Sequence, residues 1–149
     1  MTNLQSPAVP ALVLRRIYHV PRERVFAAWT NPETAARFFG PGDTQATDIR
    51  MDVKPGGTYS ITMISPEMGR LTVTGTYKEV QAPERLSMTW RWLEDDPADE
   101  YDSLLSLDFI DRNGDTELVL THEKLASAES RDRHEHGWTL IVDQLATIL

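Results

Sequence analysis

The 149-residue sequence contains no cysteine, which excludes disulfide bonds, a thiolate nucleophile and any metal site built on sulfur. It also has no apolar run near the roughly 20 residues that a membrane-spanning helix needs. The first ten residues lack the basic and apolar segments of a secretory signal, so we expect a cytoplasmic location. The length suits a single domain over residues 1–149, with residues 1–10 as a loose tail.

Basic residues are too few to dominate the surface. The 15 Lys and Arg residues stand against 23 Asp and Glu residues, which leaves a formal net charge of −8. Nucleic-acid binding needs a basic face, and attraction to an anionic membrane surface needs the same. We therefore expect neither nucleic acid nor a membrane among the partners.

Common catalytic and cofactor motifs are missing as well. The sequence contains no G-x-S-x-G, no phosphate loop and no dinucleotide fingerprint. The acidic run over 94–100 lacks the calcium-loop pattern and reads as a solvated loop. His134 and His136 are two residues apart, and residues at that spacing do not share a helix face, so no zinc-binding pair results. The sequence predicts no metal and no cofactor.

Alternation of apolar and polar residues dominates the middle of the chain and predicts consecutive β-strands. These strands are expected at 47–53, 58–64, 71–80, 86–92, 104–110 and 116–125. Asn113-Gly114 is the strongest hairpin signal between them. A further strand at 12–20 precedes them. Because consecutive strands joined by short turns pair antiparallel, the pattern predicts a meander.

Three segments show helical spacing instead. They are 22–30, 33–39 and a C-terminal stretch of about 20 residues. Either Ser127 or Ser130 is placed to cap the start of the last one. A sheet with one apolar face needs a cover, and only the C-terminal helix is long enough to provide it. The sequence therefore predicts an α+β fold.

A glycine interrupts the apolar face of that last helix. Gly137 stands four residues before Ile141, on the face that also carries Trp138. A glycine inside a helix costs about 1 kcal/mol relative to alanine. The missing side chain either lets a strand approach closely or leaves room for a ligand beside Trp138.

The order of elements and several motifs resemble the START-like, or helix-grip, superfamily (SRPBCC), the fold of the birch pollen allergen. Within it, the chain is most similar to the bacterial group of activator of heat-shock-chaperone ATPase homologues. The matching stretches are "VPRERVFAAWTNPETAARFFGP" (20–41), "DVKPGGTYSITM" (52–63), "GTYKEVQAPERLSMTWRW" (75–92), "DRNGDTELVLTHEKL" (111–125) and "HEHGWTLIVDQLATIL" (134–149).

This resemblance implies a curved antiparallel sheet of about seven strands that grips a long C-terminal helix. It also implies an internal cavity for an apolar ligand between sheet and helix. Members of the superfamily include lipid carriers, hormone binders, polyketide cyclases and co-chaperones. The resemblance therefore predicts the fold and leaves the function open.

Aromatic side chains on the inward faces of the predicted strands are the candidate cavity lining. They are Tyr59, Tyr77, Trp90, Trp92 and Phe109, and they face Trp138, Gly137 and Ile141 on the helix. Such a lining suits a flat or apolar small molecule. His122 and His134 are the candidate polar contacts. The alternatives are a core-edge histidine bonded to a neighbour for His122 and a partly exposed histidine at the helix start for His134.

Binding of a small hydrophobic or aromatic ligand is thus the leading hypothesis, in a monomer or a homodimer. A second hypothesis is a protein-interaction module, either a chaperone regulator in the stress response or a partner of a regulatory protein. It predicts an exposed apolar patch. A third is a cyclase, dehydratase or hydrolase that uses His122 or His134 as general acid or base. That enzyme would need a histidine that reaches open pocket volume.

Overall fold

The computed structural model describes residues 9–149, so all but the last two residues of the expected tail lie outside the described residues. One antiparallel sheet of seven strands has the order β1-β7-β6-β5-β4-β3-β2. The strands are β1 (Leu12–Tyr18), β2 (Gln45–Met51), β3 (Thr58–Ser65), β4 (Gly69–Gln81), β5 (Arg85–Trp92), β6 (Ser103–Arg112) and β7 (Asp115–Glu123). Strands β2 to β7 pair with their neighbours in the chain, which confirms the predicted meander.

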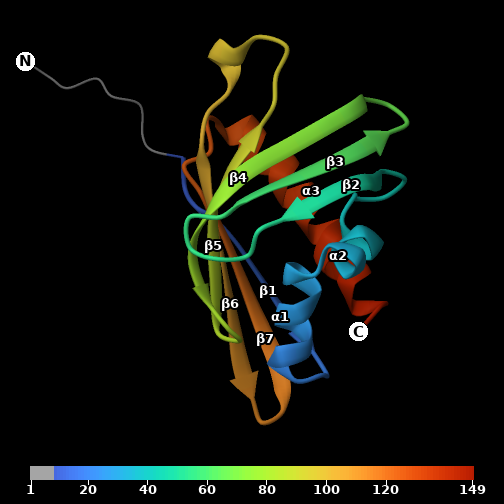
Figure 1. The fold of residues 1–149 in the computed structure, drawn as a ribbon, viewed down its shortest axis with the longest axis vertical. Helices are drawn as coiled ribbons and strands as arrows, with labels where there is room; N and C mark the ends of the chain where they lie inside the picture. The colour runs from blue at the N-terminus through green and yellow to red at the C-terminus, as the bar shows by residue number, and fades with distance from the viewer. Residues whose placement is uncertain (1–8) are drawn as a thin grey trace, which may run out of the picture.

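Three α-helices lie on the same side of the bent sheet (Figure 1). They are α1 (Arg22–Thr30), α2 (Pro32–Phe38) and α3 (Ala128–Ala146), and a short 3-10 turn, η1 (Pro97–Asp99), stands in the acidic loop. Asn31 caps α2 by accepting hydrogen bonds from the amides of Glu33 and Thr34. Ser127, rather than Ser130, caps α3. Within residues 9–149, no helix combines the length and the apolar character needed to span a membrane.

The two-residue hairpin at Asn113-Gly114 forms as its sequence predicts. Both residues have positive φ, 56° and 93°. They join Arg112 of β6 to Asp115 of β7, which are paired across the turn. Positive φ at both central positions is the property that favours Asn-Gly in tight hairpins. The register of β6 against β7 follows from this turn, and it places Leu105 opposite His122.

Gly75 lets a tyrosine pass across β4. Tyr59 in β3 stands directly opposite Gly75. The Tyr59 hydroxyl donates to the carbonyl oxygen of Thr89 in β5, 2.5 Å away. A β-carbon at Gly75 would collide with that same carbonyl oxygen and with the Tyr59 ring. The glycine is therefore required for Tyr59 to connect β3 to β5 over the strand between them.

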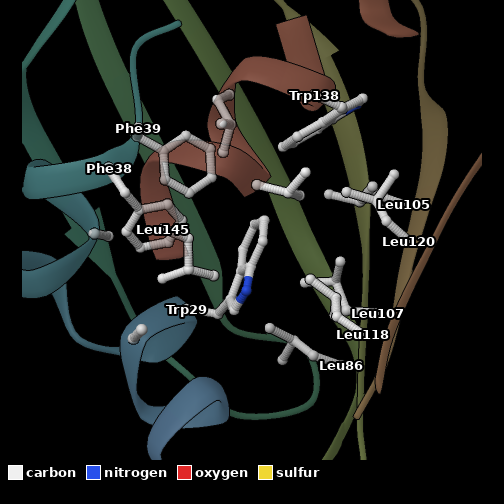
Figure 2. Close-up of a cluster of buried hydrophobic side chains, with 14 of the residues drawn as sticks. Trp29, Phe38, Phe39, Leu86, Leu105, Leu107, Leu118, Leu120, Trp138 and Leu145 are labelled. Atoms are coloured by element: carbon white, nitrogen blue, oxygen red, sulfur yellow. The ribbon is translucent and has the colours of Figure 1, made fainter. Parts of the chain in front are cut away.

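The core lies between the sheet and all three helices, not under α3 alone. Trp29 from α1 stands in the middle of the cluster, between Phe38 and Phe39 on one side and the sheet leucines on the other (Figure 2). Helix α2 packs on β2, while α1 packs on β6 and β7. The expectation that only the C-terminal helix covers the sheet missed these two helices. Although short, they follow each other across the open half of the sheet and fill much of the expected cavity.

Candidate ligand site in the interior

A small cavity lies in the interior, between the first two helices and the middle of the sheet. Its volume is about 10 Å³, which is room for roughly one water molecule. The residues that line it are Trp29, Phe39, Met51, Tyr59, Ile61, Tyr77, Leu86, Met88, Trp90 and Leu105. Sequence analysis placed Tyr59, Tyr77 and Trp90 in such a lining. No residue of the lining carries a charge.

Aromatic rings form the wall on the helix side. The rings of Trp29 and Phe39 meet edge to face with centroids 5.4 Å apart. Phe39 in turn stacks on Trp90 of β5 at 6.5 Å. Asn31 caps the end of α1 and the start of α2, and Phe39 is the C-cap directly after α2. The position of Asn31 therefore sets where both rings lie. Edge-to-face and stacked arrangements at these distances are favourable for aromatic pairs.

Two buried tryptophans in this lining have no hydrogen-bond partner for the indole N–H. They are Trp29 and Trp90, each 3% exposed, and neither Nε1 atom has a partner among the described residues. A buried donor without an acceptor costs about 1–3 kcal/mol, so native structures contain few of them. Both residues contribute to the cavity lining, and both N–H groups are themselves shut off from solvent.

The remaining polar groups of the lining are neutral. The Tyr59 hydroxyl already donates to Thr89, and burial raises the pKa of Tyr59 well above its usual value. Burial raises the pKa of Tyr77 in the same way, so both phenols stay protonated at neutral pH. The cavity is thus an apolar, uncharged space lined largely by aromatic side chains.

His122 is completely buried and lies outside this lining. Its Nδ1 accepts a hydrogen bond from the Trp138 indole at 3.0 Å, and its Nε2 lies 2.7 Å from the Ser103 hydroxyl. Since an indole N–H can only donate, Nδ1 carries no proton and Nε2–H donates to Ser103. Ser103 passes the chain on to the Trp90 carbonyl. Burial, with a smaller contribution from His134, lowers the pKa of His122 to about 3.

His134 repeats this arrangement on α3. Its Nε2 accepts from the Trp92 indole at 2.9 Å, and its Nδ1–H donates to the carbonyl of Ser130 at 2.7 Å. The two imidazole rings meet edge to face, with centroids 4.8 Å apart. Burial lowers the pKa of His134, while the bond to Ser130 acts in the opposite direction. Both histidines are therefore neutral, and each has both ring nitrogens occupied.

Neither histidine lines the interior cavity or the hollow on the outer face, and their hydrogen bonds engage both ring nitrogens of each. Protonation of His122 would also place a hydrogen directly against the Trp138 N–H. Within residues 9–149, no three His, Asp or Glu side chains gather closely enough to hold a metal ion. Through these hydrogen bonds, the two histidines join the sheet to α3.

The other predicted site residues lie elsewhere in the core. Phe109 packs edge to face on Phe26, near the opposite end of β6. Trp138 and Ile141 are buried side chains of α3 and lie outside the cavity lining. Gly137 faces neither strand nor cavity: an added β-carbon would meet only the ring of Pro41, at 3.9 Å. Gly137 therefore neither admits a strand nor leaves room for a ligand beside Trp138. The segment after α2, which contains Pro41, lies over it instead.

A larger hollow of about 600 Å³ opens to solvent on the outer face of the sheet. It is lined by Arg50, Thr58, Tyr59, Ser60, Thr74, Gly75, Thr76, Lys78, Thr89, Arg91 and Asp102. Arg91 is engaged by Asp102 at 2.7 Å and by Glu100 at 3.7 Å. Small hydroxyl side chains create this hollow, and it contains no unpartnered buried group. We therefore place the candidate site in the interior despite the smaller volume there.

Sequence analysis missed most of the residues that line the cavity. The strand members Met51, Ile61, Leu86, Met88 and Leu105 occupy inward positions of the predicted strands, so alternation was the signal that identified their face. Trp29 and Phe39 come from helical segments that were not assigned to the sheet. The sequence feature that indicates their position is the Asn31-Pro32 boundary. It ends the first helix and starts the second, so that both helices pack on the core.

A family comparison agrees with this architecture. The family described as Activator of Hsp90 ATPase homolog 1-like protein matches residues 19–149, nearly the whole chain. Curated protein sequences give no significant match.

Solved structures share the fold over most of their length. Protein CV1439 from Chromobacterium violaceum is 22% identical, with a TM-score of 0.83 over 95% of this chain and 98% of that one. The AHSA1 protein from Silicibacter pomeroyi is 27% identical, with a TM-score of 0.81 over 93% and 96%. CalU16 from Micromonospora echinospora is 23% identical, with a TM-score of 0.69 over 92% and 74%.

Proposed function

Because the chain belongs to the family of Activator of Hsp90 ATPase homolog 1-like proteins, in the START-like superfamily, we propose that it binds a small hydrophobic or aromatic molecule. The site is the interior cavity between α1, α2 and the sheet. Proteins of this fold family commonly bind hydrophobic ligands. The observation that carries the proposal is the uncharged interior cavity with its largely aromatic lining.

The cavity needs to widen for a ligand larger than water, and its lining supplies side chains that allow this. Met51 and Met88 both face it, and methionine repacks more readily than branched or aromatic residues. Met51 is half-buried and belongs to β2, the edge strand of the sheet. A ligand that displaces Met51 would enter from this edge without breaking any strand pairing.

Thermal unfolding with a panel of apolar and aromatic compounds tests the proposal. A ligand present at 100 times its Kd stabilises the folded state by about 2.7 kcal/mol. For a domain of this size that corresponds to a rise in Tm of roughly 5–10 °C. If no compound of the panel raises the Tm of the wild-type protein, the proposal is refuted.

Two matched variants locate the site. Leu105 and Leu107 are both 0% exposed on the inward face of β6, but only Leu105 lines the cavity. Each Leu→Phe substitution overpacks the core and costs about 1–3 kcal/mol of stability without ligand. Leu105→Phe should also abolish the ligand-dependent rise in Tm, whereas Leu107→Phe should keep it. An equal loss in both variants would contradict this location.

A further inference from the structure

We propose that the first half of α3, residues 128–136, is an acid-sensitive flap: protonation of His134 releases it from the sheet, and it pivots about Gly137 while the second half stays in place. This inference goes beyond the proposed function, because it concerns how α3 is attached and needs no ligand. Two observations carry it. The two halves of α3 are held by different kinds of contact, and the contact that ties the first half to the sheet needs an unprotonated imidazole nitrogen.

Apolar burial in α3 is confined to the part after Gly137. The buried apolar side chains of the helix are Trp138, Ile141, Val142 and Leu145. Before Gly137, Ser130 is the one buried residue of the helix. Gln144 also ties the second half to the segment after α2, through hydrogen bonds to the carbonyl oxygens of Phe38 and Gly40. Since apolar burial is the main force that holds a helix on a sheet, the second half is anchored and the first half is not.

Polar contacts attach the first half instead. Within residues 9–149, its side chains make three hydrogen-bonded attachments to other elements: Arg131 to the carbonyl oxygens of Pro10 and Ala11, Ser130 to the Tyr101 hydroxyl, and His134 to the Trp92 indole. The bond between His134 and Trp92 is the shortest of these, at 2.9 Å. Trp92 belongs to β5, so this bond is the direct tie between the flap and a strand of the sheet.

Protonation of His134 breaks this tie. Nδ1 already carries the proton that it donates to the Ser130 carbonyl, so an added proton must go to Nε2. Nε2–H would then face the Trp92 N–H, and two donors repel each other. The new charge would also stand near Arg133, whose own charge lowers the pKa of His134, and against the His122 ring, with centroids 4.8 Å apart.

No negative charge compensates for the added proton. The titratable groups that approach this end of α3 from other elements are His122 of β7 and Tyr101, just before β6, and neither supplies a negative charge in acid. The charged residues on the flap itself are partly or fully exposed: Glu129, Arg131, Asp132, Arg133 and Glu135. Within residues 9–149, the histidine that pairs with a carboxylate is His19, on Asp115. The closed flap therefore excludes the proton, whereas the open flap, with His134 in water, accepts it.

Native-state hydrogen exchange, followed residue by residue by NMR, tests the proposal. With a pKa of about 6.5 for His134 in water, the population of the open flap should rise by up to about 25-fold between pH 7 and pH 5. The amides of residues 132–136 should lose protection by up to this factor after correction for intrinsic exchange rates. They should also exchange faster than those of residues 141–145 at each pH. Low concentrations of urea should change their exchange little, because a local opening exposes little surface.

Glutamine substitutions at two histidines of the same half give the matched comparison. His134→Gln keeps an uncharged acceptor for the Trp92 indole but cannot titrate, so the exchange of residues 132–136 should lose most of its pH dependence. His136→Gln changes an exposed position two residues away and should keep the wild-type dependence. Gly137→Ala stiffens the pivot and should slow this exchange several-fold at pH 5 and pH 7 alike, without altering the ratio between them.

Three results would overturn the proposal. If residues 132–136 and 141–145 exchange equally at every pH, α3 opens only when the whole protein unfolds. If the pH dependence survives His134→Gln, or is lost equally in His136→Gln, His134 does not hold the flap. If His134→Gln does not fold, the indole N–H groups of the wild type decide, because opening of the flap exposes Trp92 but leaves Trp138 bonded to His122. Exchange at pH 5 that is no faster for Trp92 than for Trp138 is then the refuting result.

Discussion

Lowering the pH from 7 to 5 should destabilise this protein through His122, which the fold holds in its neutral form. In the unfolded chain a histidine has a pKa of about 6.5. In the folded protein, burial lowers the pKa of His122 to about 3. At a pH between these two values, His122 is protonated in the unfolded state but not in the folded state. The stabilisation is therefore complete above pH 6.5 and declines as the pH falls toward 3.

The size of the effect follows from these two pKa values. At pH 7 most unfolded chains carry a neutral histidine, whereas at pH 5 nearly all carry a charged one. The free energy of unfolding should fall by about 2 kcal/mol over this interval through His122 alone. His134, whose pKa is also lowered, adds to the loss. Glu79 and Glu117 do not interfere, because hydrogen bonds from Arg85 and Arg112 lower their pKa and keep them ionised at pH 5.

Urea unfolding between pH 5 and pH 7, followed by tryptophan fluorescence, measures this dependence. His122→Asn supplies an uncharged acceptor for the Trp138 indole but cannot titrate. It should be less stable at pH 7, and its pH dependence should be flatter than that of the wild type by about 2 kcal/mol over the interval. His136→Gln is the matched control, since His136 is exposed on α3, and it should keep the wild-type slope.

Two results would refute this reasoning. The first is a wild-type stability that does not change between pH 5 and pH 7. The second is a slope that survives His122→Asn unchanged. If His122→Asn does not fold, the imidazole signals of the wild-type protein supply the same test, because the His122 ring should remain neutral at pH 5.

Alanine substitutions at two glycines should change the stability of the protein in opposite directions. Gly137→Ala should raise the free energy of unfolding by about 0.5–1 kcal/mol, because it improves helix propensity and its β-carbon meets only Pro41, at 3.9 Å; a loss of stability in urea unfolding would contradict this placement of the helix. Gly75→Ala should cost at least about 2 kcal/mol, because its β-carbon collides with the Thr89 carbonyl oxygen and the Tyr59 ring; a thermal unfolding curve like that of the wild type would contradict the crossing of Tyr59 over β4.

Local patterns predicted most of the fold because each of them acts within a few residues. Alternation identified the inward faces of the strands, and Asn113-Gly114 defined a hairpin through its own backbone preferences. Three of the ten predicted site residues, Tyr59, Tyr77 and Trp90, line the cavity. Phe109 and Gly137 do not, because facing inward does not say which part of the interior a side chain reaches.

The roles of the polar core groups depended on partners that are far away in the chain. His122 becomes neutral and inert because Ser103 and Trp138 meet it from another strand and from α3. No local spacing in the sequence predicts that these three side chains come into contact. The same holds for the free donors: Trp29 and Trp92 are both tryptophans of amphipathic segments, yet only one finds an acceptor.

The sequence by itself determined the class of fold, the faces of the strands and the absence of thiol chemistry. These properties follow from residue type and local periodicity, which act without knowledge of the whole chain. The tertiary structure alone decided the size of the cavity and its chemistry. Both depend on how α1 and α2 pack across the sheet, since that packing fills most of the space and leaves the indoles of Trp29 and Trp90 without acceptors.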